Sequence, residues 1–68
     1  MNTIGQRIFY YRKKRGLTQK EFAKRLAVCP QTVSKWENDR SLPDLTTIAR
    51  IATLLSITCD ALILGEND

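Results

Sequence analysis

The chain has 68 residues and a mass of 7.8 kDa, with 11 Lys and Arg residues against 7 Asp and Glu residues. A chain this short buries only roughly 60% of its unfolded surface, which suits one modest core and a single domain over residues 1–68. It has no His and 2 Cys, too few for a multi-ligand metal site or a nucleophile–imidazole pair, so we expect neither an enzyme nor a cofactor. No apolar run approaches the ~18 residues of a membrane span, and early arginines argue against a signal peptide, which favours a cytoplasmic protein.

The charges are segregated along the chain. Residues 1–40 contain ten basic and three acidic residues, a net charge of +7, whereas residues 41–68 contain one basic and four acidic residues, a net charge of −3. Such asymmetry suggests a first half that faces a polyanion and a second half with another role. On charge alone, a solvated basic surface explains the pattern equally well, so nucleic-acid binding has to be argued from geometry.

Apolar residues spaced at period 3.6 predict five short helices and no strand, an all-α fold. The first helix covers residues 3–15, and we expect Gly16 to end it in a left-handed conformation. The second covers residues 18–26 and opens with a capping box in which Glu21 reaches back to the Thr18 amide.

Pro30 marks the start of the third helix, residues 30–38, because proline suits the first helical position and disfavours a helical residue before it. A fourth helix begins near Asp44, and a short fifth helix, residues 59–64, runs between Thr58 and Gly65. The fourth helix is expected to bury Leu45, Ile48, Ala49, Ala52 and Leu55.

The second and third helices are separated by about three residues, the spacing of a helix-turn-helix, here residues 18–38. On a helical wheel at ~100° per residue, the third helix has an apolar side with Val33 and Trp36. Its opposite side carries amide, hydroxyl and ammonium groups, which can hydrogen-bond the edges of bases. Since any surface helix has a polar face, the wheel alone does not establish this role.

Four stretches of sequence resemble the Cro/CI-type (Xre-family) helix-turn-helix domain, which is lambda-repressor-like. They are Gly-Leu-Thr-Gln-Lys-Glu-Phe-Ala (16–23), Gln-Thr-Val-Ser-Lys-Trp-Glu-Asn (31–38), Leu-Pro-Asp-Leu-Thr-Thr-Ile-Ala (42–49) and Asp-Ala-Leu-Ile (60–63). The resemblance extends from Ile4 to Gly65. It implies a compact five-helix fold and a transcriptional regulator that binds double-stranded DNA sequence-specifically, expected to be a repressor acting as a homodimer on a palindromic operator.

The resemblance also implies roles for individual residues. The base-reading positions and their supporting contacts fall on Gln31, Lys35, Ser34 and Thr32. The positions that contact the DNA backbone fall on Gln19, Asn38 and Arg40. A structural ion pair between the first and third helices falls on Arg12 and Glu37.

The sequence departs from the family pattern at several positions in and beside the helix-turn-helix. The family usually has glycine at the position of Ala27 and often at that of Asp39. A left-handed Ala27 would cost ~1–2 kcal/mol, so either that strain is present or the turn has another shape. Asp39 tolerates the conformation better, but places a negative charge near the phosphate-facing loop. Pro30 stands where lambdoid phage repressors have a base-reading glutamine, and it offers no donor.

Leu64 lies where the family usually has a polar residue. An exposed leucine on the last helix, in the acidic half, indicates a partner surface, and we predict a homodimer through residues 57–68. Cys29 precedes the third helix, where a thiol either becomes redox-sensitive or serves as a small, weak cap.

A protein-interaction module, such as an antitoxin or accessory regulator acting through the acidic half, is the alternative function. This sequence carries no effector domain or toxin-binding tail after the last helix, from which we expect a stand-alone DNA binder unless these residues are a fragment of a longer protein. A binder of RNA or single strands would need exposed aromatic stacking residues, whereas Trp36 is expected in the core. We expect no membrane partner, and no small-molecule effector site is evident.

Overall fold

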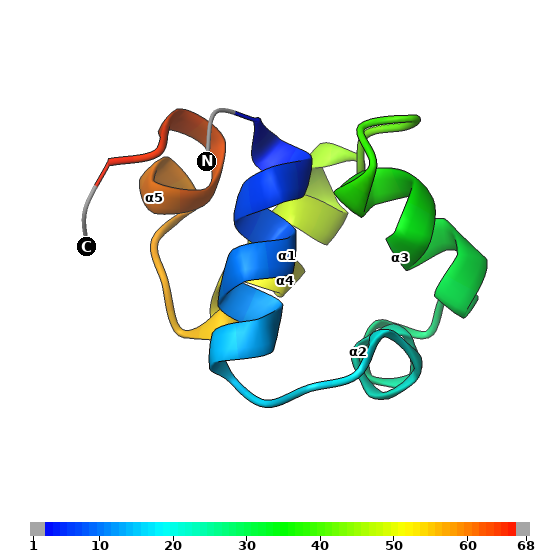
Figure 1. Cartoon of the computed structure of the whole chain (residues 1–68). Helices are drawn as coiled ribbons and strands as arrows, with labels where there is room; N and C mark the ends of the chain where they lie inside the picture. The colour runs from blue at the N-terminus through cyan, green and yellow to red at the C-terminus, as the bar shows by residue number, and fades with distance from the viewer. Residues whose placement is uncertain (1–2, 67–68) are drawn as a thin grey trace.

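The computed structural model describes residues 3–66, and this part of the chain consists of five α-helices joined by short loops, with no strand. The helices are α1 (Ile4–Lys14), α2 (Gln19–Leu26), α3 (Pro30–Glu37), α4 (Leu45–Leu55) and α5 (Cys59–Leu64). Helix α1 runs through the middle of the molecule, with α5 on one side and the pair α2 and α3 on the other (Figure 1). The predicted all-α, five-helix fold is therefore confirmed. None of the helices within residues 3–66 is long and apolar enough to cross a membrane.

Side-chain caps begin four of these five helices. Each cap accepts a hydrogen bond from a backbone amide of the first turn, which otherwise lacks a partner. The caps are Thr3, Thr18, Asp44 and Thr58. Helix α3 differs because Cys29 forms no side-chain cap hydrogen bond, and Pro30 occupies the first turn instead. The weak cap considered for Cys29 is therefore not formed by its thiol.

The turn between α2 and α3 is left-handed although it contains no glycine. Ala27 ends α2 with φ 57° and ψ 41°, and the amide of Val28 then donates to the carbonyl of Ala23 at 3.0 Å. This arrangement is that of a helix C-terminus normally built on glycine. Of the two possibilities that the sequence left open, the structure therefore has the strained one, at a cost of ~1–2 kcal/mol.

The hydrophobic core is shared by all five helices. Its largest fully buried side chains are Phe22, Ile8, Ile51, Leu55, Leu62 and Val33. Trp36 is only 5% exposed, so its predicted place in the core is confirmed and it offers no stacking surface. The expectation that exposed aromatic residues are lacking was wrong, because Phe9 and Tyr10 on α1 are 48% and 42% exposed.

The predicted inner face of α4 was wrong at two positions. Leu45 is 78% exposed and Ala49 is also exposed, whereas Ile51, which was not predicted to point inward, is fully buried. Apolar residues occupy most of the circumference of this helix, so the sequence does not select one stripe. The selection comes from packing against α1, α2 and α5.

Helix α1 approaches the end of α3 closely at Gly5. A side chain there would collide with the Trp36 carbonyl oxygen and with the Asp39 carboxylate. That carboxylate accepts hydrogen bonds from the Gly5 amide at 3.1 Å and from the Thr3 hydroxyl at 2.7 Å. Asp39, with φ 58°, thus places its charge at the positive end of α1, where it is stabilising. The Asp39 carboxylate, which the sequence places near the phosphate-facing loop, therefore has its hydrogen-bond partners at the N-terminus of α1.

Two arginines, one within α1 and one directly after it, donate hydrogen bonds to backbone carbonyls at the ends of other helices. Arg7 is 7% exposed, and its Nε and Nη2 donate to the carbonyls of Leu62 at 2.6 Å and Ile63 at 2.7 Å. Arg15 Nε donates to the Leu55 carbonyl at 2.9 Å. Cations near helix C-termini complement the carbonyls exposed there. Not all of the basic residues of the first half are therefore available to a polyanion, because Arg7 and Arg12 are buried.

Candidate nucleic-acid interface

Helices α2 and α3 form the predicted helix-turn-helix, joined by residues 27–29. Val33 and Trp36 of α3 are buried against the rest of the domain. Because side chains three and four residues apart share a helix face, the opposite side of α3 is directed outward. The fold therefore presents one side of a short, rigidly packed helix to solvent.

The four residues predicted to contact bases all reach this outer surface to some degree. Gln31 and Lys35 are exposed, one helical turn apart on the same face. Thr32 and Ser34 are half-buried at its margins. The structure therefore brings the four side chains together on α3, with Gln31 and Lys35 the most accessible.

The loop after α3 contains two residues predicted to contact the DNA backbone, Asn38 and Arg40. The Asn38 amide nitrogen donates to the Ser34 carbonyl at 2.8 Å and lies 3.4 Å from the Ser34 hydroxyl. Asn38 thus covers the end of α3, which leaves its amide oxygen as an acceptor. Arg40 is exposed, and its backbone amide donates to the Lys35 carbonyl at 2.8 Å.

Arg12 and Glu37 form a buried ion pair between α1 and α3. Arg12 Nε lies 2.6 Å from Glu37 Oε2, and Nη2 lies 3.0 Å from Glu37 Oε1. The two side chains are 5% and 3% exposed. Arg12 Nη1 also donates to the Leu17 carbonyl at 2.7 Å, just before α2 begins. The pair therefore joins α1, the start of the helix-turn-helix and α3.

Gln19 belongs to the same network. Its amide nitrogen donates to Glu37 Oε1 at 2.9 Å, and the side chain is half-buried. A primary amide has two N–H donors, so one holds Glu37 and the other is left for an external acceptor. The sequence predicted Gln19 and Glu37 in separate roles, whereas the structure joins them.

The start of α2 is reinforced by Glu21. Its carboxylate accepts a hydrogen bond from the Thr18 amide at 2.9 Å, and its own amide donates to the Thr18 hydroxyl at 3.0 Å. The hydrogen bond from the Thr18 backbone amide, followed by that from the Thr18 hydroxyl, holds the pKa of Glu21 below its ordinary value, because bonds donated to the carboxylate favour its ionised form. The predicted capping box is thus confirmed, and it fixes the helix end that carries Gln19.

Sequence reasoning missed the structural roles of Asp39 and Arg7. For Arg7 a signal was present, because it follows Ile4 by three residues and precedes Tyr11 by four, which places it on the inner face of α1. For Asp39 no local pattern marks the bond to Gly5, which lies 34 positions away. Both residues hold α1 in place relative to the interface.

The described residues contain no group of three or more His, Cys, Asp or Glu side chains that could hold a metal ion. Cys29 and Cys59 are both free and exposed. Leu64, at the end of α5, is 63% exposed. Residues 67–68 of the predicted dimerisation region lie outside the described residues.

Comparisons of sequence relate this chain to regulators of transcription. A helix-turn-helix family model matches residues 8–62. The immunity repressor protein of Bacillus phage phi105 is 37% identical over 65 residues, spanning 96% of this chain and 44% of that protein. The regulator ImmR of Bacillus subtilis is 33% identical over 66 residues, spanning 97% and 51%. Since the chain spans 31% to 59% of the length of the curated relatives it matches, it corresponds to one part of such proteins.

Comparisons of structure give the same relationship. The P22 c2 repressor, solved in complex with a synthetic operator, matches with a TM-score of 0.90 and 26% identity over 97% of this chain and 100% of that chain. SinR, solved in complex with DNA, matches with a TM-score of 0.81 and 28% identity over 88% and 97%. Given the family match over most of the chain and this agreement in fold, the chain belongs to the Cro/CI-type (Xre) helix-turn-helix family.

Proposed function

We propose that this chain is a sequence-specific, double-stranded DNA-binding domain of a transcriptional regulator, with α3 as its recognition helix. The observation that carries the proposal is the outward face of α3, on which Gln31 and Lys35 are exposed one turn apart. Gln can pair with the edge of adenine and Lys with the acceptors of guanine in the major groove. Ser34 and Thr32 add hydroxyl groups at the margin of the same face.

Contacts to phosphates would orient α3 in the groove. The second N–H of Gln19 is available next to the first-turn amides of α2, and a helix N-terminus attracts phosphate. Arg40 supplies a positive charge in the loop after the C-terminal end of α3. The Asn38 amide is held by Ser34, so we assign Asn38 a smaller part, through its oxygen or a bridging water.

We further propose that the protein acts in the cytoplasm as a repressor and as a homodimer. Related proteins are named as an immunity repressor and as a c2 repressor in complex with an operator. Two copies would place two α3 helices in successive major grooves, ~34 Å apart, and the operator would then be a near-palindrome.

The dimer would form through α5, where Leu64 exposes an apolar side chain in the acidic half of the chain. Leu64→Glu should weaken self-association in sedimentation equilibrium, because it puts a charge at the contact. Leu45→Glu is the matched control, since Leu45 is also an exposed leucine, at 78% against 63% for Leu64, but lies on α4. If both variants associate like the wild type, the dimer surface lies elsewhere.

Selection from a pool of random duplexes tests the function itself. We expect enrichment of a two-fold symmetric sequence whose half-sites are about 10 base pairs apart. Affinity for the selected duplex should fall steeply as salt rises, since phosphate contacts release counterions. A pool that yields no preferred sequence, or a preference for single strands, would contradict the proposal.

A further inference from the structure

A groove between α2 and α4 lies away from the proposed DNA-binding surface. It has a volume of about 440 Å³, and its lining includes Arg25 and Leu26 in the last turn of α2 and Ala49, Arg50 and Leu54 along α4. Gln19, which we assign to phosphate, is at the other end of α2. The groove is therefore a separate surface that DNA recognition by α3 leaves uncovered.

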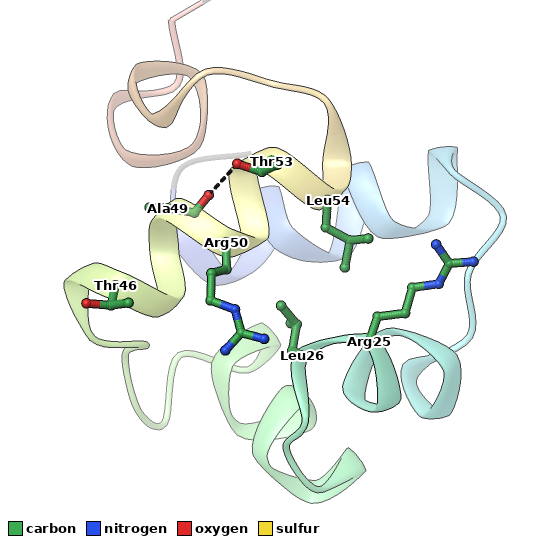
Figure 2. A pocket seen from close by; sticks show the side chains of 7 residues that line it. All are labelled: Arg25, Leu26, Thr46, Ala49, Arg50, Thr53 and Leu54. Carbon is green, nitrogen blue, oxygen red and sulfur yellow. Dashed lines mark hydrogen bonds between the residues drawn. The ribbon is translucent and has the colours of Figure 1, made fainter.

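The floor of the groove is apolar. Figure 2 shows Leu26 and Leu54 pointing toward one another from α2 and α4, with Ala49 further along α4. The Thr53 hydroxyl donates to the Ala49 carbonyl at 3.0 Å, so its hydrogen bond is made within α4. Covering such a floor with apolar groups is favourable because it removes the floor from water.

The two sides of the groove are positively charged. In Figure 2, Arg50 and Arg25 lie on either side of the leucine pair. Both are exposed, and within residues 3–66 neither guanidinium forms a hydrogen bond or an ion pair. The charge of Arg25 acts on Glu21, one turn earlier on α2, only as a minor contribution to the lowered pKa of that carboxylate. Arg7, Arg12 and Arg15, by contrast, all bind internal acceptors. A guanidinium group pairs with a carboxylate through two parallel hydrogen bonds, so these two arginines are suited to an anionic partner.

We propose that this groove docks an acidic amphipathic segment of a partner protein. Apolar side chains of the segment would cover Ala49 and the half-buried Leu54, above the buried Leu26. Its carboxylates would pair with Arg25 and Arg50. Charge complementarity identifies the occupant. A ligand that fits the groove has to carry apolar groups for the floor and anionic groups for the two arginines, and an acidic amphipathic segment carries both. A DNA backbone would neutralise the arginines but leave Ala49 and the exposed part of Leu54 in contact with water.

The test selects peptides from a random display library on the wild-type chain and on the double variant Arg25→Gln/Arg50→Gln. Peptides enriched on the wild type should combine Asp or Glu with leucine-like residues. A synthetic peptide of the enriched sequence should shift the NMR amide signals of the end of α2 and of α4. It should bind the double variant at least tenfold more weakly than the control Lys13→Gln/Lys14→Gln, which removes the same charge from exposed positions on α1.

Ala49→Glu provides an independent variant, because it adds a carboxylate to the floor at an exposed position, and it should abolish peptide binding. The proposal is overturned if acidic peptides are not enriched, if they bind the arginine variant as well as the control, or if the shifted signals lie on α3. It is also overturned if Arg25→Gln/Arg50→Gln weakens DNA binding more than the lysine control. A changed oligomeric state of Ala49→Glu would assign the groove to a second copy and equally overturn it.

Discussion

Replacing Glu37 by glutamine tests the buried network that joins α1, α2 and α3. Glu37 accepts hydrogen bonds from Arg12 at 2.6 and 3.0 Å and from Gln19 at 2.9 Å. Glutamine keeps one oxygen acceptor and most of the volume of glutamate, but it removes the negative charge. The Arg12 guanidinium, whose side chain is 5% exposed, would then be buried without a counterion.

The expected loss of stability is large relative to the total. Breaking a buried pair by removing one partner costs about 3–5 kcal/mol, and glutamine should fall near the lower figure because Arg12 keeps the Leu17 carbonyl. At 0.05–0.15 kcal/mol per residue, a chain of this length has roughly 3–10 kcal/mol of stability in all. With about 4–8 °C per kcal/mol in a domain of this size, the midpoint of thermal unfolding should fall by roughly 12–24 °C.

Urea unfolding followed by the fluorescence of Trp36, which is 5% exposed in the folded chain, measures this loss. Glu66→Gln is the control, because it neutralises an exposed carboxylate and should change stability by less than about 0.5 kcal/mol. The double variant Arg12→Met/Glu37→Leu replaces both charges by apolar groups and should recover most of the loss. A loss below about 1 kcal/mol for Glu37→Gln, or a double variant as unstable as Glu37→Gln, would refute the reasoning.

Two further predictions concern the ends of α2. Ala27→Gly should stabilise the chain by about 0.5–1 kcal/mol in the same urea assay, since it relieves a left-handed alanine at φ 57° at some cost in chain entropy. Ala49→Gly, in the exposed interior of α4, should instead destabilise it by about 0.5–1 kcal/mol, and a loss at both sites would mean that Ala27 is not strained. Glu21 has a folded pKa below its ordinary value of 4.5, so it contributes stability above that pH and loses it as the pH falls through the folded pKa. Thermal unfolding midpoints of Glu21→Gln should therefore fall less on acidification than those of the wild type, and parallel curves would contradict this.

Local chemistry was enough to predict the helices and their order. Helix ends depend on residues close together in the chain, so they can be predicted from the sequence. Examples are the capping box of Thr18 and Glu21 and the glycines after α1 and α5. The polar face of α3 was predictable for the same reason, since its period is set by the helix itself. Which residues lie on that face needed no tertiary information, whereas their role in reading bases follows from the resemblance and stays a prediction.

What depends on distant partners could not be predicted from local patterns. Leu45 is exposed against the prediction, and Ile51, for which no inward position was predicted, is buried, because the helices packed on α4 decide which of its sides faces the core. Asp39 binds an amide of α1, and Arg7 binds a carbonyl 55 positions away. Gln19 matched a phosphate-contacting residue by resemblance, but its bond to Glu37 becomes visible only once α2 and α3 are packed together.

The most direct test of the central claim compares Lys35→Ala and Arg40→Ala on the selected duplex and on random duplexes. If α3 reads bases, Lys35→Ala should lower the ratio of the two affinities by about 5- to 150-fold, equivalent to about 1–3 kcal/mol, and relax the preference at one base pair. Arg40→Ala should weaken binding to both duplexes alike and reduce the salt dependence by about one phosphate contact. An unchanged affinity ratio for Lys35→Ala would contradict the assignment of α3 as the recognition helix.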